Sequence, residues 1–478
     1  MAEHDSKARD SVGTHEHSWW RVAQRRLLGV TPVDAPIQWT PETVVALVLA
    51  CFCALLANSA GIGGGPFYLP ILNIMLGFNL KAATALSHTI VATSALASSV
   101  YGFLHTSPTH PDRPLVDLDL VITFVPALLL GVSFGVLFNV LFPEWLQTAL
   151  LVVLLAVVVW KTAAKGLKQW QQEQNAKKAD SEREQLLNGE EAGDGEEEDA
   201  GVLHEEAFHR NPSIKRDKDF QVVEPHPDDA EAQRRRIAGT QPGLRGFLAR
   251  MQIGKLLFVL ALWAVYLATE LWKARNNRCS TGYFLAYGTQ AAVLLVVTAT
   301  MMWHKARKME QHRPLMDPEL AAILSNNGKG APIRTLIKVS SIMAFAGACA
   351  GLLGIGGALI FNPVLLQLTV NPQVCASTSV LMILFSSSAI AISLGFQGLL
   401  NVHYAAVFAP TCFLGSLLGV TIVGRLIKSS GRTSIIVILL TVLITIGAFV
   451  TAVFGVIHTV QRYQELGHLP GFSPFCQD

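Results

Sequence analysis

The chain has 478 residues, of which 51% are hydrophobic and only 15% are charged. Several of its apolar stretches exceed the roughly 18 residues that cross a bilayer as a helix, so the composition indicates a multi-pass membrane protein rather than a soluble globular one. The formal net charge of +2 averages over very different regions and gives no indication of a nucleic-acid partner.

The chain begins with a polar tail, residues 1–42. The tail lacks the short apolar core and small-residue cleavage site of a signal peptide, so we expect the first membrane segment to act as the insertion signal. Its Lys and Arg residues predict a cytoplasmic location. The seven cysteines of the chain fall mostly in apolar stretches, and their spacing predicts neither a zinc site nor a disulfide framework.

A first membrane block covers residues 43–166. Hydropathy divides it into four segments, near 43–78, 82–104, 118–142 and 145–164. The first is unusual because it contains GIGGGPFYLPIL at residues 61–72, and no charged residue lies between Glu42 and Lys81. Four glycines and two prolines in twelve residues are typical of an interrupted helix.

Residues 167–254 form an acidic polar stretch, with EEAGDGEEED at 190–199. Such a segment cannot bury enough apolar surface to offset its ordering entropy, so we interpret it as a disordered linker. The linker contains an acidic dileucine pattern, a possible signal for a cytosolic sorting adaptor, formed by Glu182, Leu186 and Leu187. Short patterns of this kind also arise by chance in acidic segments.

The second half begins with an inserted helix pair, residues 255–304, and a basic loop, residues 305–332. A second membrane block, 333–458, and a C-terminal tail, 459–478, complete the chain. Within this block no charged residue occurs from Val339 to Gly424. The predicted fold is an all-α polytopic membrane protein of about ten transmembrane helices.

The two membrane blocks repeat each other. Residues 61–72 align without a gap with GIGGALIFNPVL at 354–365. Further along, the same P-x4-G-x3-G spacing joins two sets of residues, Pro126, Gly131 and Gly135 in the first block and Pro410, Gly415 and Gly419 in the second. Each block also carries a hydroxyl-rich patch, Ala83–Ser87 and Ala376–Ser379. This order predicts two homologous four-segment repeats, each with a glycine-rich broken helix, separated by the linker and the helix pair.

A helix interrupted at membrane depth exposes backbone N–H and C=O groups, which survive only where protein or water satisfies them. Two broken segments therefore predict a cavity. If a half-helix begins after the glycines, its free N–H groups and positive dipole end form an anion site. The alternative is that the glycines only let helices pack closely, as small-xxx-small motifs do.

Neither repeat has an acidic residue in its interior, and backbone N–H groups with hydroxyls suit a small oxyanion. His88 could carry a coupled proton, or it could simply bond a neighbouring hydroxyl. We interpret Asp117, Asp119 and Glu270 as facing the membrane interface. No nucleophile, metal-ligand set or carboxylate pair converges, so we expect no enzyme activity, no metal site and no cofactor.

These glycine-rich segments, each followed by a proline and a Ser/Thr patch, resemble those of the sulfite exporter TauE/SafE family of permeases. The acidic linker and the added helix pair look like its eukaryotic branch. The resemblance implies transport of sulfite, sulfonates, thiosulfate or related organosulfur anions. Carried over by position, it implies a substrate pathway of Gly61, Gly63, Gly64, Gly65, Pro70, Thr84, Ser87, Gly354, Gly356, Gly357, Pro363, Ser377, Thr378 and Ser379. Ala358 replaces the last glycine of the second copy, so the half-sites could be unequal, and Asn362 could add a polar ligand.

The hypothesis is a secondary transporter that works by alternating access between the repeats, in the plasma membrane or an endomembrane of vacuolar type. An anion channel and a membrane-anchored trafficking adaptor acting through the linker are the alternatives. Lys and Arg residues are concentrated in the tail, the linker and loop 305–338, which predicts that all three lie on the cytoplasmic side of the membrane. The first block then crosses the membrane an even number of times, so the two repeats would run parallel. This prediction depends on the number of membrane crossings. One basic loop, with Arg425, Lys428 and Arg432, would then lie on the wrong side of the membrane. The number of crossings changes if a glycine-rich segment re-enters instead of crossing.

Overall fold

The computed structural model describes residues 32–107, 113–160, 252–277, 279–311, 332–367 and 372–430, with scattered positions elsewhere. Contacts divide the chain into two units, 1–166 with 248–478, and 167–247. The second unit contains the dileucine pattern and, apart from two isolated positions, lies outside the described residues.

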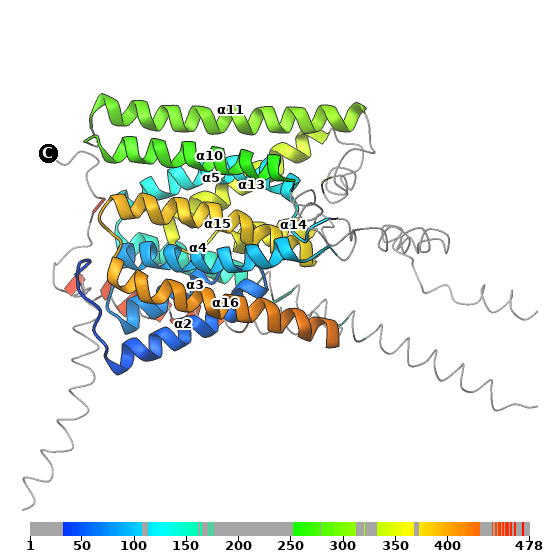
Figure 1. Cartoon of the computed structure of the whole chain (residues 1–478). Helices are drawn as coiled ribbons and strands as arrows, with labels where there is room; N and C mark the ends of the chain where they lie inside the picture. Colours follow the sequence, from blue (N-terminus) through cyan, green and yellow to red (C-terminus); the bar gives the residue numbers. More distant parts are fainter. Residues whose placement is uncertain are drawn as a thin grey trace, which may run out of the picture. The chain divides into compact units, whose positions relative to one another are not determined.

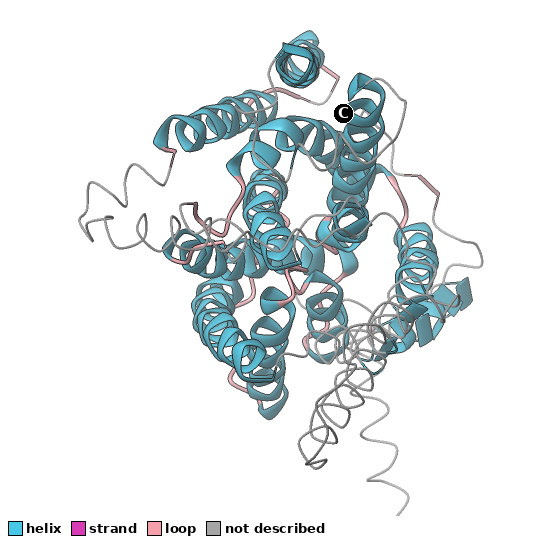
Figure 2. Cartoon of the chain, turned by 90° about the vertical axis from the view of Figure 1, so that its right-hand side faces the viewer, coloured by secondary structure: helices cyan, strands magenta, loops and turns pink. Residues whose placement is uncertain are grey.

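The described part is all-α, which confirms the predicted fold class. Figure 2 shows helices joined by loops, and the described residues add only an isolated β-bridge between Thr106 and Pro114. Seven described helices are long and apolar enough to cross a membrane. A shorter apolar helix covers Glu144–Trp160.

The predicted interruption of the first segment is present. Helix α2 (Pro41–Ser59) starts at Thr40, whose side chain accepts a hydrogen bond from the Thr43 N–H. After the glycines, α3 (Gly65–Pro70) passes directly into the π-helix η1 (Ile71–Met75). Pro70 lies at this junction, where a residue without an N–H leaves a gap in the α-helical ladder.

Helices α4 and α5 both begin at side-chain caps. Helix α4 (Leu80–Leu104) begins after Asn79, whose side chain accepts from Ala82 N at 2.8 Å. Helix α5 (Leu118–Leu141) begins after Asp117, which accepts from Asp119 N and Leu120 N. Such caps satisfy N–H groups that a helix start leaves free.

The second half begins with the inserted pair, α10 (Ile253–Ala274) and α11 (Thr281–Gln311) (Figure 1). The second repeat then follows in the same order as the first, with α13 (Pro332–Leu353), α14 (Ala358–Gln367), α15 (Pro372–Phe396) and α16 (Val402–Ser430). The residues between α13 and α14 are the second glycine cluster, 354–357, so this interruption is present as well. Helices α10 and α11 pack against each other and against α5.

In each repeat, the helix that carries the P-x4-G-x3-G motif packs on the first helix of the other repeat, α5 on α13 and α16 on α2. The glycines of the P-x4-G-x3-G motif make both contacts. A methyl group added at Gly135 would lie 2.3 Å from the Ala348 carbonyl oxygen, and one at Gly419 would lie 2.0 Å from that of Leu55. Ala348 and Leu55 are equivalent in the gapless alignment of the two clusters. These glycines therefore act by close helix packing.

The repeats run in opposite directions, so the expectation of parallel repeats is wrong. Helices α4 and α15 are antiparallel, because His88 meets Ser387 whereas Gly102 meets Ser377. The physical reason is that each glycine-rich segment turns back instead of crossing. In the first half, Phe78 returns to Tyr404 at the start of α16, near the end where α2 began.

The residues next to the N-terminal tail lie at one end of the helices, whereas those next to the linker and the basic loop lie at the other end. The three segments therefore do not share the one side that the sequence had predicted. Ala35 accepts a hydrogen bond from Asn401, which lies beyond the last turn of α15. Lys255 and Lys305, which flank the linker and the basic loop, both bond Asp119 near the first turn of α15. Arg425, at the end of α16, lies at the same end as the two lysines, because α16 runs parallel to α4. The basic residues that follow the ninth predicted span did not fit the number of crossings predicted from the sequence. They fit when both glycine-rich segments re-enter the membrane instead of crossing it.

Candidate functional site

The two glycine clusters lie against each other inside the bundle. A methyl group added at Gly65 would lie 2.6 Å from the carbonyl carbon of Ile355. Residues 61–65 and 354–357 are all buried. Five of their glycines have a left-handed backbone that only glycine adopts freely, with φ of +76° at Gly61, +85° at Gly63, +79° at Gly64, +74° at Gly354 and +71° at Gly356.

Each cluster leaves several backbone N–H groups unused. Around the first cluster, Ile62 N donates to the Ala57 carbonyl and Phe67 N to that of Gly64. Among the described residues, no acceptor takes the N–H groups of residues 63–65. In the second cluster the N–H groups of residues 355–357 are unpaired in the same way. A buried unpaired N–H costs several kcal/mol in hydrocarbon, so both clusters favour a ligand that accepts hydrogen bonds.

The two half-sites are unequal, because Asn362 occupies a position that is apolar in the first repeat. Its side-chain amide donates to the Gly61 carbonyl at 2.8 Å and its side-chain oxygen accepts from the Ser379 hydroxyl. The equivalent residue in the first half is Leu69, whose methyl carbon would lie 3.2 Å from a methyl group added at Gly354. The amide therefore places a polar side chain beside only one cluster.

The structure brings most of the hydroxyl patches to the clusters. Ser87 donates to the Gly354 carbonyl at 3.3 Å. Thr84 would lie 3.0 Å from a methyl group added at Gly354, and its own hydroxyl donates to the Leu80 carbonyl. Thr378 does something else, because its hydroxyl oxygen accepts from Asp117 N at the start of α5. Pro363 lies within α14, beyond the second cluster.

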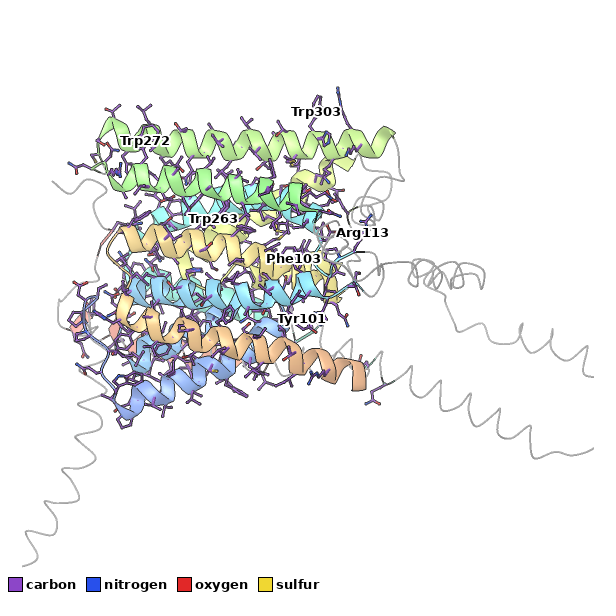
Figure 3. All side chains as sticks on the ribbon, viewed as in Figure 1. Tyr101, Phe103, Arg113, Trp263, Trp272 and Trp303 are labelled. Carbon is purple, nitrogen blue, oxygen red and sulfur yellow. The ribbon has the colours of Figure 1, made fainter. Side chains whose placement is uncertain are left out.

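A cavity of about 170 Å³ leads toward the first cluster. Its wall includes Ala376, whose Cα would lie 2.6 Å from a methyl group added at Gly61, and the predicted residue Ser377. Sequence reasoning missed the other polar lining residues, Asn58, Ser59, Ser98, Tyr101, His105, Thr106 and Gln373. Scattered single polar residues form no motif, so only the packing of α2, α4, α15 and α16 brings them together. Figure 3 shows Tyr101 near the end of the helices that also holds Arg113.

A model of the family described as sulfite exporter TauE/SafE matches residues 18–161 and 237–454. The chain belongs to this family. The sulfite exporter TauE/SafE family protein 3 of Arabidopsis thaliana is 28% identical over 453 residues, which cover 94% of this chain and 86% of the relative. Family protein 5 of the same plant is 26% identical over 472 residues, which cover 97% and 94%. No solved structure is significantly similar to the chain.

In this TauE/SafE chain, His88 is fully buried and both ring nitrogens are bonded. Nε2 lies 3.0 Å from the Ala350 carbonyl oxygen, which can only accept, so Nε2 carries a proton. Nδ1 lies 3.2 Å from the Ser387 hydroxyl. This geometry matches the interpretation of a histidine bonded to a hydroxyl neighbour, and it ties α4 to α13 and α15.

Three acidic residues of the TauE/SafE chain were expected at the membrane interface; Asp117 is half-buried, and the other two are buried instead. Asp119 is 6% exposed and forms ion pairs with Lys255 and Lys305. Glu270 is also 6% exposed and pairs with Lys273 at 2.5 Å. The reason is that α10 and α11 cover α5, which hydropathy alone could not reveal. Among the described residues, no group of His, Cys, Asp or Glu could hold a metal.

Proposed function

We propose that this chain is a permease for small sulfur-containing anions, such as sulfite, sulfonates or thiosulfate. The observation that supports it best is the pair of facing glycine clusters with unpaired N–H groups. The names of the family and of its Arabidopsis relatives, all called sulfite exporter TauE/SafE proteins, give the substrate class. Sulfur oxyanions present several acceptor oxygens, which suit a site made of N–H groups.

In this proposal the substrate binds beside the two clusters, which contact each other. Its oxygens accept from the N–H groups of residues 63–65 and 355–357, which the positive end of the α14 dipole supports. Ser87 and Ser379 hold the carbonyl of Gly354 and the amide of Asn362 in place. Left-handed glycines let the anion approach the backbone closely.

Transport would follow from the inverted repeats. The cavity of about 170 Å³ leads toward the first cluster from the end of the bundle that bears Arg425. Exchanging the conformations of the two repeats would close this cavity and open an equivalent one from the other end. Basic residues at this end favour the cytoplasm. Cys279, at the opposite end, is disulfide-bonded, which favours an oxidising compartment there.

The test is purified protein in liposomes with a panel of labelled sulfite, sulfate, thiosulfate and taurine, with and without a pH gradient. We expect saturable uptake of at least one anion, stimulated by counter-flow. Unsaturable flux without counter-flow would support a channel instead. No flux of any anion would contradict the proposal.

Two substitutions test the site itself. Gly64→Val adds a side chain where a methyl group would already lie 2.8 Å from the Tyr68 ring, and Gly357→Val crowds Phe361. Both should abolish flux while membrane insertion is retained. Replacing residues 167–247 by a neutral Gly/Ser sequence is the control, because a carrier should keep its flux and an adaptor should lose its function. Normal flux in both valine variants would contradict the site.

A further inference from the structure

The hydroxyl group of Tyr68 is buried beside the first glycine cluster. Tyr68 lies in α3, four residues after Gly64, and is 1% exposed. A methyl group added at Gly64 would lie 2.8 Å from the Tyr68 hydroxyl oxygen, so the ring folds back over the start of the helix. The N–H group of Gly64 has no acceptor among the described residues. An O–H donor therefore lies next to unused N–H donors.

This hydroxyl has no hydrogen-bond partner among the described residues. Ser94 on α4 lies beside it, is fully buried and also lacks a partner. A hydrogen bond between the two side chains would use only one of their two O–H protons, so the other proton would still need an acceptor. Burying a donor without an acceptor is unfavourable. The pair therefore favours a bound group that accepts hydrogen bonds.

The second repeat has no hydroxyl at this position. The equivalent residue, Phe361, packs in the same way, with a ring carbon 3.2 Å from a methyl group added at Gly357. The serine equivalent to Ser94 is Ser387, which is bonded to Nδ1 of His88. Both repeats therefore pack an aromatic ring on a glycine, and a phenyl ring is sufficient for that. The Tyr68 hydroxyl needs another explanation.

We propose that Tyr68 is a substrate-binding residue of the first half-site, and that its hydroxyl donates a hydrogen bond to an oxygen of the bound anion. The inference rests on the proposed function, which gives the anion as a sulfur oxyanion. Sulfite, sulfonates and thiosulfate each have three oxygens, so one anion accepts from the N–H groups of residues 63–65 and from this hydroxyl at once. Ser94 supplies the second O–H proton of the pair.

Tyr68→Phe tests the hydroxyl alone, because it gives the first repeat the ring of the second. The experiment is calorimetric titration of the purified full chain with sulfite, sulfate, thiosulfate and taurine, and thermal melting in a buffer free of these anions. The anion that wild type binds most tightly should bind Tyr68→Phe about ten- to hundredfold more weakly, because a hydrogen bond to a charged group is lost. The melting temperature should not fall, because the hydroxyl has no partner in the protein.

Tyr266→Phe is the matched control. Tyr266, on α10, is also 1% exposed, and its hydroxyl is also without a partner in the described part of the chain. Helix α10 packs mainly on α5, α11 and α15 rather than on the glycine-rich segments. Tyr266→Phe should therefore bind the anion as tightly as wild type does.

Three results would overturn the inference. They are equal affinity of wild type and Tyr68→Phe, an equal loss of affinity in Tyr266→Phe, and a lower melting temperature of Tyr68→Phe without anion, which would give the hydroxyl a partner inside the protein. Each of these leaves the proposed function intact as long as wild type shows flux in liposomes. Absence of both binding and flux in wild type contradicts the proposed function, and the role of Tyr68 with it.

Discussion

Gly61 and Gly356 have similar left-handed backbones, with φ of +76° and +71°, but different surroundings. A methyl group added at Gly61 would lie 2.6 Å from the Ala376 Cα, which belongs to the α15 backbone. One added at Gly356 would have a single neighbour, the Ile62 carbonyl oxygen at 3.7 Å. Alanine substitutions at the two sites therefore distinguish two costs. Both variants strain the backbone, but only Gly61→Ala also meets the backbone of α15.

The left-handed conformation costs an alanine about 1–2 kcal/mol, which both variants share. Overpacking against a backbone that must shift adds about 1–3 kcal/mol. Gly356→Ala should therefore lower the free energy of unfolding by about 1–2 kcal/mol, and Gly61→Ala by about 2–5 kcal/mol.

The assay is equilibrium unfolding of both purified variants in mixed micelles, with flux in liposomes measured in parallel. Gly61→Ala should also lose flux, because it pushes α15 away from the first cluster. Equal destabilisation of the two variants would refute the close approach of Gly61 to α15.

Three further variants test other contacts. Asn362→Leu copies the first repeat and leaves the Ser379 hydroxyl without its acceptor, so it should cost about 1–3 kcal/mol and reduce flux; unchanged flux in liposomes would mean that the amide has no role in the site. Asp119→Asn removes the carboxylate that Lys255 and Lys305 share, which should cost about 3 kcal/mol in unfolding experiments, whereas a stability equal to wild type would contradict the ion pairs. Gly419→Val should separate α16 from α2 and lower the melting temperature sharply, and a well-folded variant with normal melting would contradict that contact.

The glycine-rich interruptions were predictable because their cause is local. Glycine alone adopts positive φ freely, and an uncharged segment with four glycines and two prolines cannot stay helical. The family was recognisable from the same residues. The role of Thr378 was not predictable, because its partner Asp117 is 261 residues away in sequence.

The direction of the repeats was predicted wrongly for a physical reason. Counting charged loops assumes that each apolar segment crosses the membrane, but a broken segment is long enough either to cross or to turn back. The contacts of Phe78 with Tyr404 and of Ala35 with Asn401 show that the segment ends near the end of the bundle where α2 begins, so it re-enters. They join residues far apart in the chain, so no local pattern encodes them.

The sequence by itself determined an all-helical membrane chain with two matched interruptions, because hydropathy and glycine content act residue by residue. Only the tertiary structure decided that the two clusters meet, and that Asp119 and Glu270 are buried under α10 and α11. Burial of a charge depends on which helix covers it, and helix packing depends on small residues such as Gly135 and Gly419 meeting a backbone elsewhere in the chain.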